Sequence, residues 1–232
     1  MFPPIEDLEE RLFYYKEKID RDLEDLEINP NFSDGVESLL RDTNTFSLIA
    51  LALGMSPEKS EYKEAVPVLI AAAYKLNDVK DLDSAKAGIE SLRKAFEQKS
   101  DISALQWTKV AHLVPVMKKA LPSLSTEIKR LTRSERTFRR GSNPSKIIGD
   151  SAAIAAIALG CRPNVDETLA PKEADLWNLY CLQLHKASMD LNRAAHGVKS
   201  GSVSFEELSK AFDLLDSTCS STCHEKFGGT VE

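Results

Sequence analysis

Apolar residues recur at spacings of three and four along almost the whole chain, and no long stretch alternates between apolar and polar residues. The first segment shows this spacing at Leu8, Leu12, Tyr15 and Ile19. Such spacing places side chains on one face of an α-helix, whereas a half-buried strand has a period of two. The chain also has only 10 Gly and 10 Pro among its 232 residues. We therefore predict an all-α protein.

Helix-breaking residues between the periodic segments predict where the helices begin and end. In the first half we expect helices over residues 3–28, 33–54, 61–98 and 101–122. The third of these is expected to bend near Pro67 and Asn77. In the second half we expect helices over residues 125–142, 147–160, 171–198 and 203–227.

The second half of the chain repeats the first. The matching blocks are Leu51-Ala-Leu-Gly54 with Ile157-Ala-Leu-Gly160, Lys86-Ala87 with Lys186-Ala187, and Ile102-Ser103 with Val203-Ser204. Their common order favours a duplication over chance similarity between Ala/Lys-rich helices. A chain of 232 residues is also comfortable for two helical domains. We predict two tandem four-helix bundles, formed by residues 1–122 and 123–232.

The last predicted helix ends in Cys219-Ser-Ser-Thr-Cys223-His224. Covalent haem attachment uses the motif C-x-x-C-H, in which two thiols bond to the haem vinyl groups and the histidine ligates iron. Here the motif is C-x-x-x-C-H, with one extra residue. On a helix, residues four apart lie on one face, so both thiols still face one ligand. They also continue an apolar stripe through Phe212 and Leu215.

These residues make the second half resemble cytochrome c′ and the related class II cytochromes c. The shared features are four antiparallel helices, an Ala-rich second helix and the haem motif at the end of the fourth. The resemblance implies one covalent haem c per chain, with Cys219 and Cys223 as thioether residues and His224 as proximal iron ligand. The first half lacks the motif, because Lys118, Pro122 and Ser123 stand at the matching positions.

The resemblance also implies a function and a location. It implies electron transfer or small-ligand binding without enzymatic turnover, and hence a redox partner protein or a small gaseous ligand. Haem is attached covalently outside the bacterial cytoplasm, so we expect a periplasmic or otherwise exported protein, although no signal peptide is visible at the start of the sequence.

In this family the first helix of the bundle covers the distal face of the haem. Residues 123–160 contain neither His nor Met, so we expect a five-coordinate iron. Met189, His185 and His196 on the predicted third helix are the alternative sources of a sixth ligand.

The alternatives to haem use the same cysteines. Cys181 and His185 are four residues apart, as are Cys219 and Cys223, and two such pairs on facing helices would form a tetrahedral zinc site. The other choices are a disulfide between Cys219 and Cys223 or between Cys161 and Cys181, or cysteines that are simply buried apolar groups without a site. Each of these would make the protein a helical structural or interaction protein rather than a cytochrome.

Composition limits the remaining functions. A net charge of −6 and a pI near 5.4 argue against nucleic acid as the main partner. Lys129, Arg133, Arg136 and Arg140 fall on one face of the predicted 125–142 helix. We expect this face to be solvated, to contact the haem propionates or to dock an acidic partner.

The short apolar runs predict no membrane span. No phosphate-binding loop or nucleophile elbow is visible, and exposed apolar helix faces are compatible with a homodimer.

Overall fold

The computed structural model describes residues 1–28, 32–103, 105, 111–164 and 171–218. Its regular elements are helices, and no strand occurs in these ranges, as predicted. The main helices are α1 (Ile5–Ile28), α2 (Phe32–Met55), α3 (Val66–Lys75), α4 (Leu82–Ala95), α5 (Leu113–Pro115), α6 (Leu121–Leu131), α7 (Glu135–Phe138), α8 (Asn143–Cys161), α9 (Pro171–Ser200) and α10 (Phe205–Ser217).

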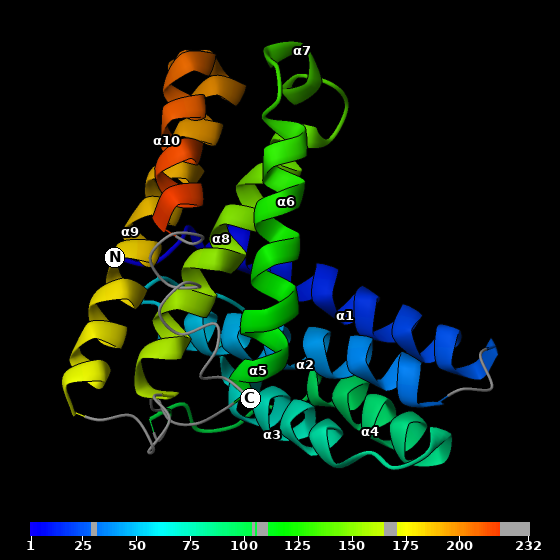
Figure 1. Cartoon of the computed structure of the whole chain (residues 1–232). Coiled ribbons are helices and arrows are strands. Elements are labelled where there is room, and N and C mark those ends of the chain that lie inside the picture. Colours follow the sequence, from blue (N-terminus) through cyan, green and yellow to red (C-terminus); the bar gives the residue numbers. More distant parts are fainter. Residues whose placement is uncertain (29–31, 104, 106–110, 165–170, 219–232) are drawn as a thin grey trace.

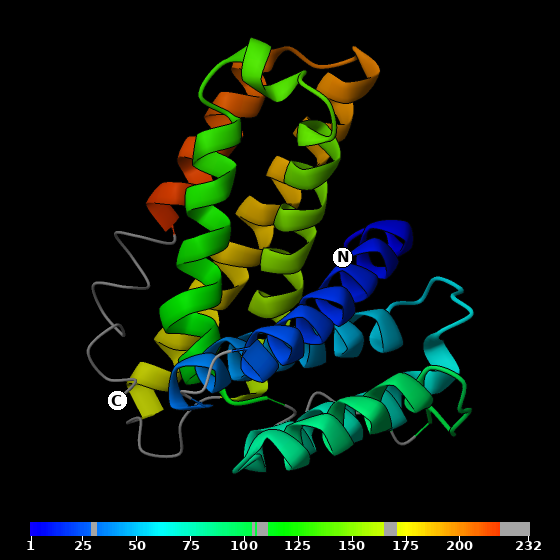
Figure 2. The same ribbon diagram turned by 90° about the vertical axis from the view of Figure 1, so that its right-hand side faces the viewer.

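The helices form two groups. In Figure 1, α6, α8, α9 and α10 stand side by side, and we call these four the upright group. The transverse group, α1 to α4, lies across the lower end of the upright group (Figure 2). Helix α8 joins the groups because it packs against α9 on one side and against α1 and α2 on another. One continuous cluster of buried apolar residues runs through both groups.

Helix α8 is the central element because almost all of its side chains are buried. Its small alanines let neighbouring helices approach closely, and Gly160 has Leu48 of α2 directly beside its Cα. Within the described ranges, α8 is also the helix that is long and apolar enough to cross a membrane, but 78% of its apolar window is buried inside the fold. Packing therefore accounts for its hydropathy.

The predicted single helix over residues 61–98 is wrong. The chain forms α3 and α4 instead, which pack against each other and are separated by a short 3-10 turn at Leu76–Asp78. Asp81 begins α4 with a capping box, because its carboxylate accepts from the Ser84 amide at 2.8 Å. This local cap starts a new helix where the periodicity alone suggested a bend.

The predicted helices 101–122 and 125–142 also have different bounds. Residues 101–103 are not helical, and a helical segment runs without interruption from Leu113 through a π-helical turn at Val116–Ala120 into α6. The expected boundary between residues 122 and 123 falls inside this segment. Pro122 is accommodated in the first turn of α6, directly after the π turn. At its other end, α6 stops at Leu131, and Ser134 caps the separate helix α7.

Candidate functional site

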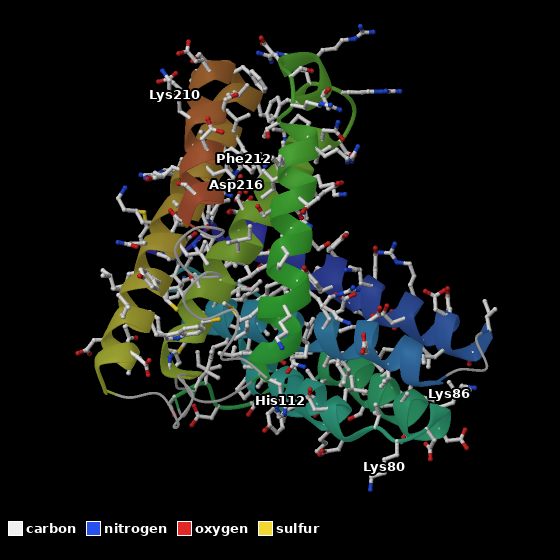
Figure 3. The ribbon with its side chains drawn as sticks, in the orientation of Figure 1. Lys80, Lys86, His112, Lys210, Phe212 and Asp216 are labelled. Atoms are coloured by element: carbon white, nitrogen blue, oxygen red, sulfur yellow. The ribbon has the colours of Figure 1, made fainter. Side chains whose placement is uncertain are left out.

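The chain reaches the predicted haem motif at the lower end of α10. Leu208, Phe212 and Leu215 are buried, as their spacing predicted. One turn beyond Phe212, Asp216 accepts a hydrogen bond from Ser125 Oγ at 3.3 Å and lies 3.2 Å from Lys129 Nζ. Figure 3 shows Phe212 and Asp216 on α10 beside α6. The last turns of α10 therefore lie beside α6.

The motif itself, Cys219, Cys223 and His224, lies outside the described residues. Thr218 is the last residue before it and caps the C-terminus of α10.

The basic residues of the predicted 125–142 helix do not share one helix face, contrary to prediction. Lys129 lies on α6 and pairs with Asp216, whereas Arg136 lies on α7. Thr132 ends α6 between them and its hydroxyl donates to the Ile128 carbonyl at 2.9 Å. Arg133, Arg136 and Arg140 are exposed. Among the residues of the predicted face, Lys129 therefore contacts α10, through Asp216.

Sulfur-containing side chains gather near the lower end of the upright group. The Sγ atom of Cys161 on α8 is 3.9 Å from the Sδ atom of Met117 on the π turn. Trp177 of α9 donates its indole N–H to the Cys161 carbonyl at 2.9 Å. Cys181 is also buried, and no disulfide joins it to Cys161 in the described part of the chain. The sequence analysis did not associate Met117 with Cys161, because it placed the helix that contains Met117 in the first half of the chain.

The geometry of His185 bears on the zinc alternative. Its Nδ1 lies 3.1 Å from the Ala155 carbonyl oxygen and its Nε2 lies 2.8 Å from the Met1 carbonyl oxygen. A zinc ligand must offer a lone pair from one ring nitrogen, but both nitrogens of His185 face oxygens that only accept hydrogen bonds. Across the described residues, no three His, Cys, Asp or Glu side chains come together in a way that could hold a metal.

The other candidate ligands on α9 differ in their surroundings. His196 Nε2 lies 2.9 Å from Asp7 Oδ2, and the same oxygen accepts from Asn192 Nδ2 at 2.9 Å. This trio joins α1 to α9. Met189 is buried. The structure therefore uses both histidines in contacts with the N-terminal segment.

A second polar site lies where α1 meets α8. Arg11 Nη1 is 3.0 Å from Asp150 Oδ1, and Arg11 Nη2 donates to the Lys146 carbonyl at 3.0 Å. The Arg11 and Asp150 side chains are almost completely buried. Burial raises the pKa of Asp150 to about 6, against the opposing effect of Arg11. Gly149 makes the contact possible, because a Cβ there would lie 1.9 Å from Arg11 Nε.

A neighbouring charge cluster joins α1 to α2. Asp42, only 1% exposed, accepts two hydrogen bonds of 2.8 Å from Arg41 and lies 2.9 Å from Lys18 Nζ. Burial and the nearby Asp42 carboxylate raise the pKa of Asp22 to about 7. Burial, with a smaller effect from Asp42, also raises the pKa of the Tyr15 phenol. Perturbed groups gathered in this way are typical of functional sites, although structural ion-pair networks also produce them.

Sequence analysis did not identify these charged residues, although a signal was present. Arg11 falls within the apolar stripe of α1 between Leu8 and Leu12, and Asp150 interrupts the Ala-rich apolar stretch of α8. A charged residue at a core position is rarely buried without a partner. Each such position could therefore have been predicted to need an opposite charge.

No protein-family model, no curated protein and no solved structure matches this chain.

Proposed function

We propose that this protein is a c-type haem protein that transfers electrons or binds a small gaseous ligand. Cys219 and Cys223 would form thioether bonds to one haem, and His224 would be the proximal iron ligand. Two thiols followed by an imidazole are the donor set that covalent haem attachment requires. When bound, haem supplies one-electron redox chemistry or a coordination position for a small gas.

The observation that carries the proposal is the buried stripe of α10. Leu208, Phe212 and Leu215 face the interior, and the same spacing in the sequence continues to Cys219 and Cys223. Asp216 near the end of this helix contacts Ser125 and Lys129 of α6. A haem bonded to two cysteines at this spacing would be buried inside the upright group, where its apolar faces leave water.

We further propose that the two helix groups are the products of the duplication, as two four-helix bundles over residues 1–122 and 123–232. Only the second would carry haem, because the first has no cysteine. The protein would have no turnover chemistry of its own. A redox partner protein and an exported location, either periplasmic or otherwise outside the cytoplasm, belong to the same proposal.

The contacts of the α9 histidines support a five-coordinate iron. Both ring nitrogens of His185 lie against carbonyl oxygens, and His196 is engaged by Asp7. Neither imidazole would reach the iron without giving up these contacts. A vacant sixth position suits binding of a small gas better than rapid electron transfer.

Expression for export in cells that contain a covalent haem-attachment system tests the proposal. Wild-type protein should show a Soret band that remains with the polypeptide after acid-acetone extraction. The Cys219→Ala/Cys223→Ala double variant should lose the band. Cys181→Ala is the matched control, because it removes a cysteine outside the motif and should keep the band.

The His224→Ala variant and the haem content of wild-type protein test the proposal further. His224→Ala should retain bound haem but shift the Soret band, because the thioether bonds do not need the imidazole while the iron does. If wild-type protein acquires no haem in cells that mature a control c-type cytochrome, the proposed function is wrong.

A further inference from the structure

A cavity of about 540 Å³ lies between α1, α2, α6 and α8. Its lining includes Tyr14, Tyr15, Asp42, Ser123, Thr126 and Asp150. Asp42 and Asp150 are almost completely buried, whereas Ser123 and Thr126 on α6 are exposed. The volume lies within the range of small-molecule sites, about 300–1,000 Å³.

One buried acceptor on this cavity lacks a hydrogen bond. Asp150 Oδ1 faces Arg11, but its Oδ2 has no hydrogen-bond partner among the described residues. Asp150 is only 2% exposed. A buried carboxylate oxygen without a donor is costly and uncommon in native proteins, and therefore requires an explanation. A ligand that donates a hydrogen bond would satisfy this oxygen.

The charges around the cavity are already balanced. Lys18 and Arg41 both bind Asp42. Lys146 binds Glu127. Because these three cations already face carboxylates, an anionic ligand would compete with existing ion pairs. A cationic ligand on Asp150 would meet Arg11, which already pairs with that carboxylate. The cavity therefore favours an uncharged ligand.

The rest of the lining suits a ligand with several hydroxyl groups. Tyr14, Tyr15, Ser123 and Thr126 bring hydroxyls that both donate and accept hydrogen bonds. The Tyr14 and Tyr15 rings meet edge to face with centroids 5.4 Å apart and add aromatic carbons to the lining, and Lys18 Nζ lies over both rings. Aromatic surface beside polar groups matches the C–H and O–H faces of a sugar or cyclic polyol.

From these contacts we infer a second binding site, for an uncharged polyhydroxyl compound such as a monosaccharide or cyclic polyol. One ligand hydroxyl donates to Asp150 Oδ2, and the tyrosine rings flank the carbon skeleton. The site joins helices from both groups. Binding would therefore tighten the junction between α1 and α8.

Calorimetric titration of the full chain tests the inference with glucose, galactose and myo-inositol as uncharged probes. Glucosamine and glucuronate provide nearly the same skeleton with a positive or a negative charge. At least one uncharged probe should bind, and the charged analogues should bind at least tenfold more weakly. Failure of all three uncharged probes to bind would overturn the inference, as would equal or tighter binding of a charged analogue.

Two variants locate the site. Thr126→Trp places a large side chain on the exposed rim without touching the buried ion pair, and should weaken binding at least tenfold. Ser91→Trp on α4 introduces the same side chain at an exposed position outside the cavity and should leave affinity unchanged. Asp150→Asn should also weaken binding. If Asp150→Asn folds poorly, the affinity of Thr126→Trp is the result that tests the inference. Unchanged affinity in Thr126→Trp would show that the probe binds elsewhere and would overturn the inference.

Discussion

Arg11 on α1 and Asp150 on α8 form an ion pair 3.0 Å long whose two side chains are only 3% and 2% exposed. Ion pairs at the surface, such as that between Lys186 and Asp190, each contribute little to stability. The Arg11–Asp150 pair is instead almost completely buried where the transverse and upright groups meet. Removing one partner leaves the other charge buried, so the junction depends on both.

Asp150→Asn should lower the free energy of unfolding by about 3 kcal/mol, because it leaves the Arg11 guanidinium buried without a counter-charge. Urea denaturation followed by circular dichroism measures the change. Asp190→Asn is the matched control, because Asp190 pairs with Lys186 and Arg193 at the surface. That variant should lose less than about 1 kcal/mol. Equal losses in the two variants would contradict the account of the junction.

Gly149→Ala should destabilise the protein although alanine is the better helix former by about 1 kcal/mol. The new Cβ would lie 1.9 Å from Arg11 Nε and would push the guanidinium away from Asp150. Urea denaturation of Gly149→Ala and of the Asp150→Asn/Gly149→Ala double variant measures the effect. The two losses should be less than additive because both changes break the same pair. A stabilised Gly149→Ala protein would show that Arg11 does not need this space.

The pH dependence of stability should change in Asp22→Asn. The pKa of Asp22 is raised in the fold to about 7 by burial and by Asp42, whereas the unfolded chain has an ordinary value near 3.8. Asp22 therefore holds a proton in the fold that it loses on unfolding. Its stabilising contribution is fully present below about pH 4 and is lost as pH rises through 7.

The asparagine side chain does not titrate, so the stability of the Asp22→Asn variant relative to wild type should increase between about pH 4 and about pH 8. The expected increase is on the order of 2 kcal/mol. Chemical denaturation of both proteins across this range measures it, and Asp20→Asn, at a more exposed position on the same helix, provides the control. A stability difference that does not vary with pH would mean that Asp22 has an ordinary pKa in the fold.

Periodicity predicted the apolar faces of the helices better than their ends. The stripes through Leu8, Leu12 and Tyr15 and through Leu208, Phe212 and Leu215 are buried as expected, because burial depends on spacing that is visible in the sequence. The break between α3 and α4 was missed because it depends on the Asp81 cap and on packing between the two helices. Neither the cap nor the packing can be recognised from the local spacing of apolar residues.

The two candidate sites also differ in how much of each can be read from the sequence. The proposed haem motif is contiguous in the sequence, so proposing it requires no knowledge of the fold, and its residues lie outside the described part of the chain. The cavity near Asp150 could not be predicted in this way, because its walls come from four helices that are far apart in the chain, from Tyr14 on α1 to Asp150 on α8. A charged residue within an apolar stripe marks such a place, but its partner depends on how α1 crosses α8. That crossing is a property of tertiary packing.

His185→Gln should lower stability without changing haem binding. The imidazole lies between the Ala155 and Met1 carbonyl oxygens, and a glutamine side chain cannot reach both in the same way. A loss of about 1–2 kcal/mol is expected for disrupted buried hydrogen bonds. The Soret maximum of haem-loaded protein should stay in place. A shifted maximum would make His185 an iron ligand, and stoichiometric zinc in wild type that is lost in His185→Gln would support the zinc alternative instead.

The most direct test of the central claim is the mass of one tryptic peptide from exported, haem-matured protein. Trypsin cleaves after Lys210 and Lys226, so the peptide of residues 211–226 contains Cys219, Cys223 and His224 together. The account predicts that this peptide carries the added mass of one haem and has no thiol that reacts with an alkylating reagent. An unmodified peptide with two reactive thiols, from cells that mature a control cytochrome, would contradict it.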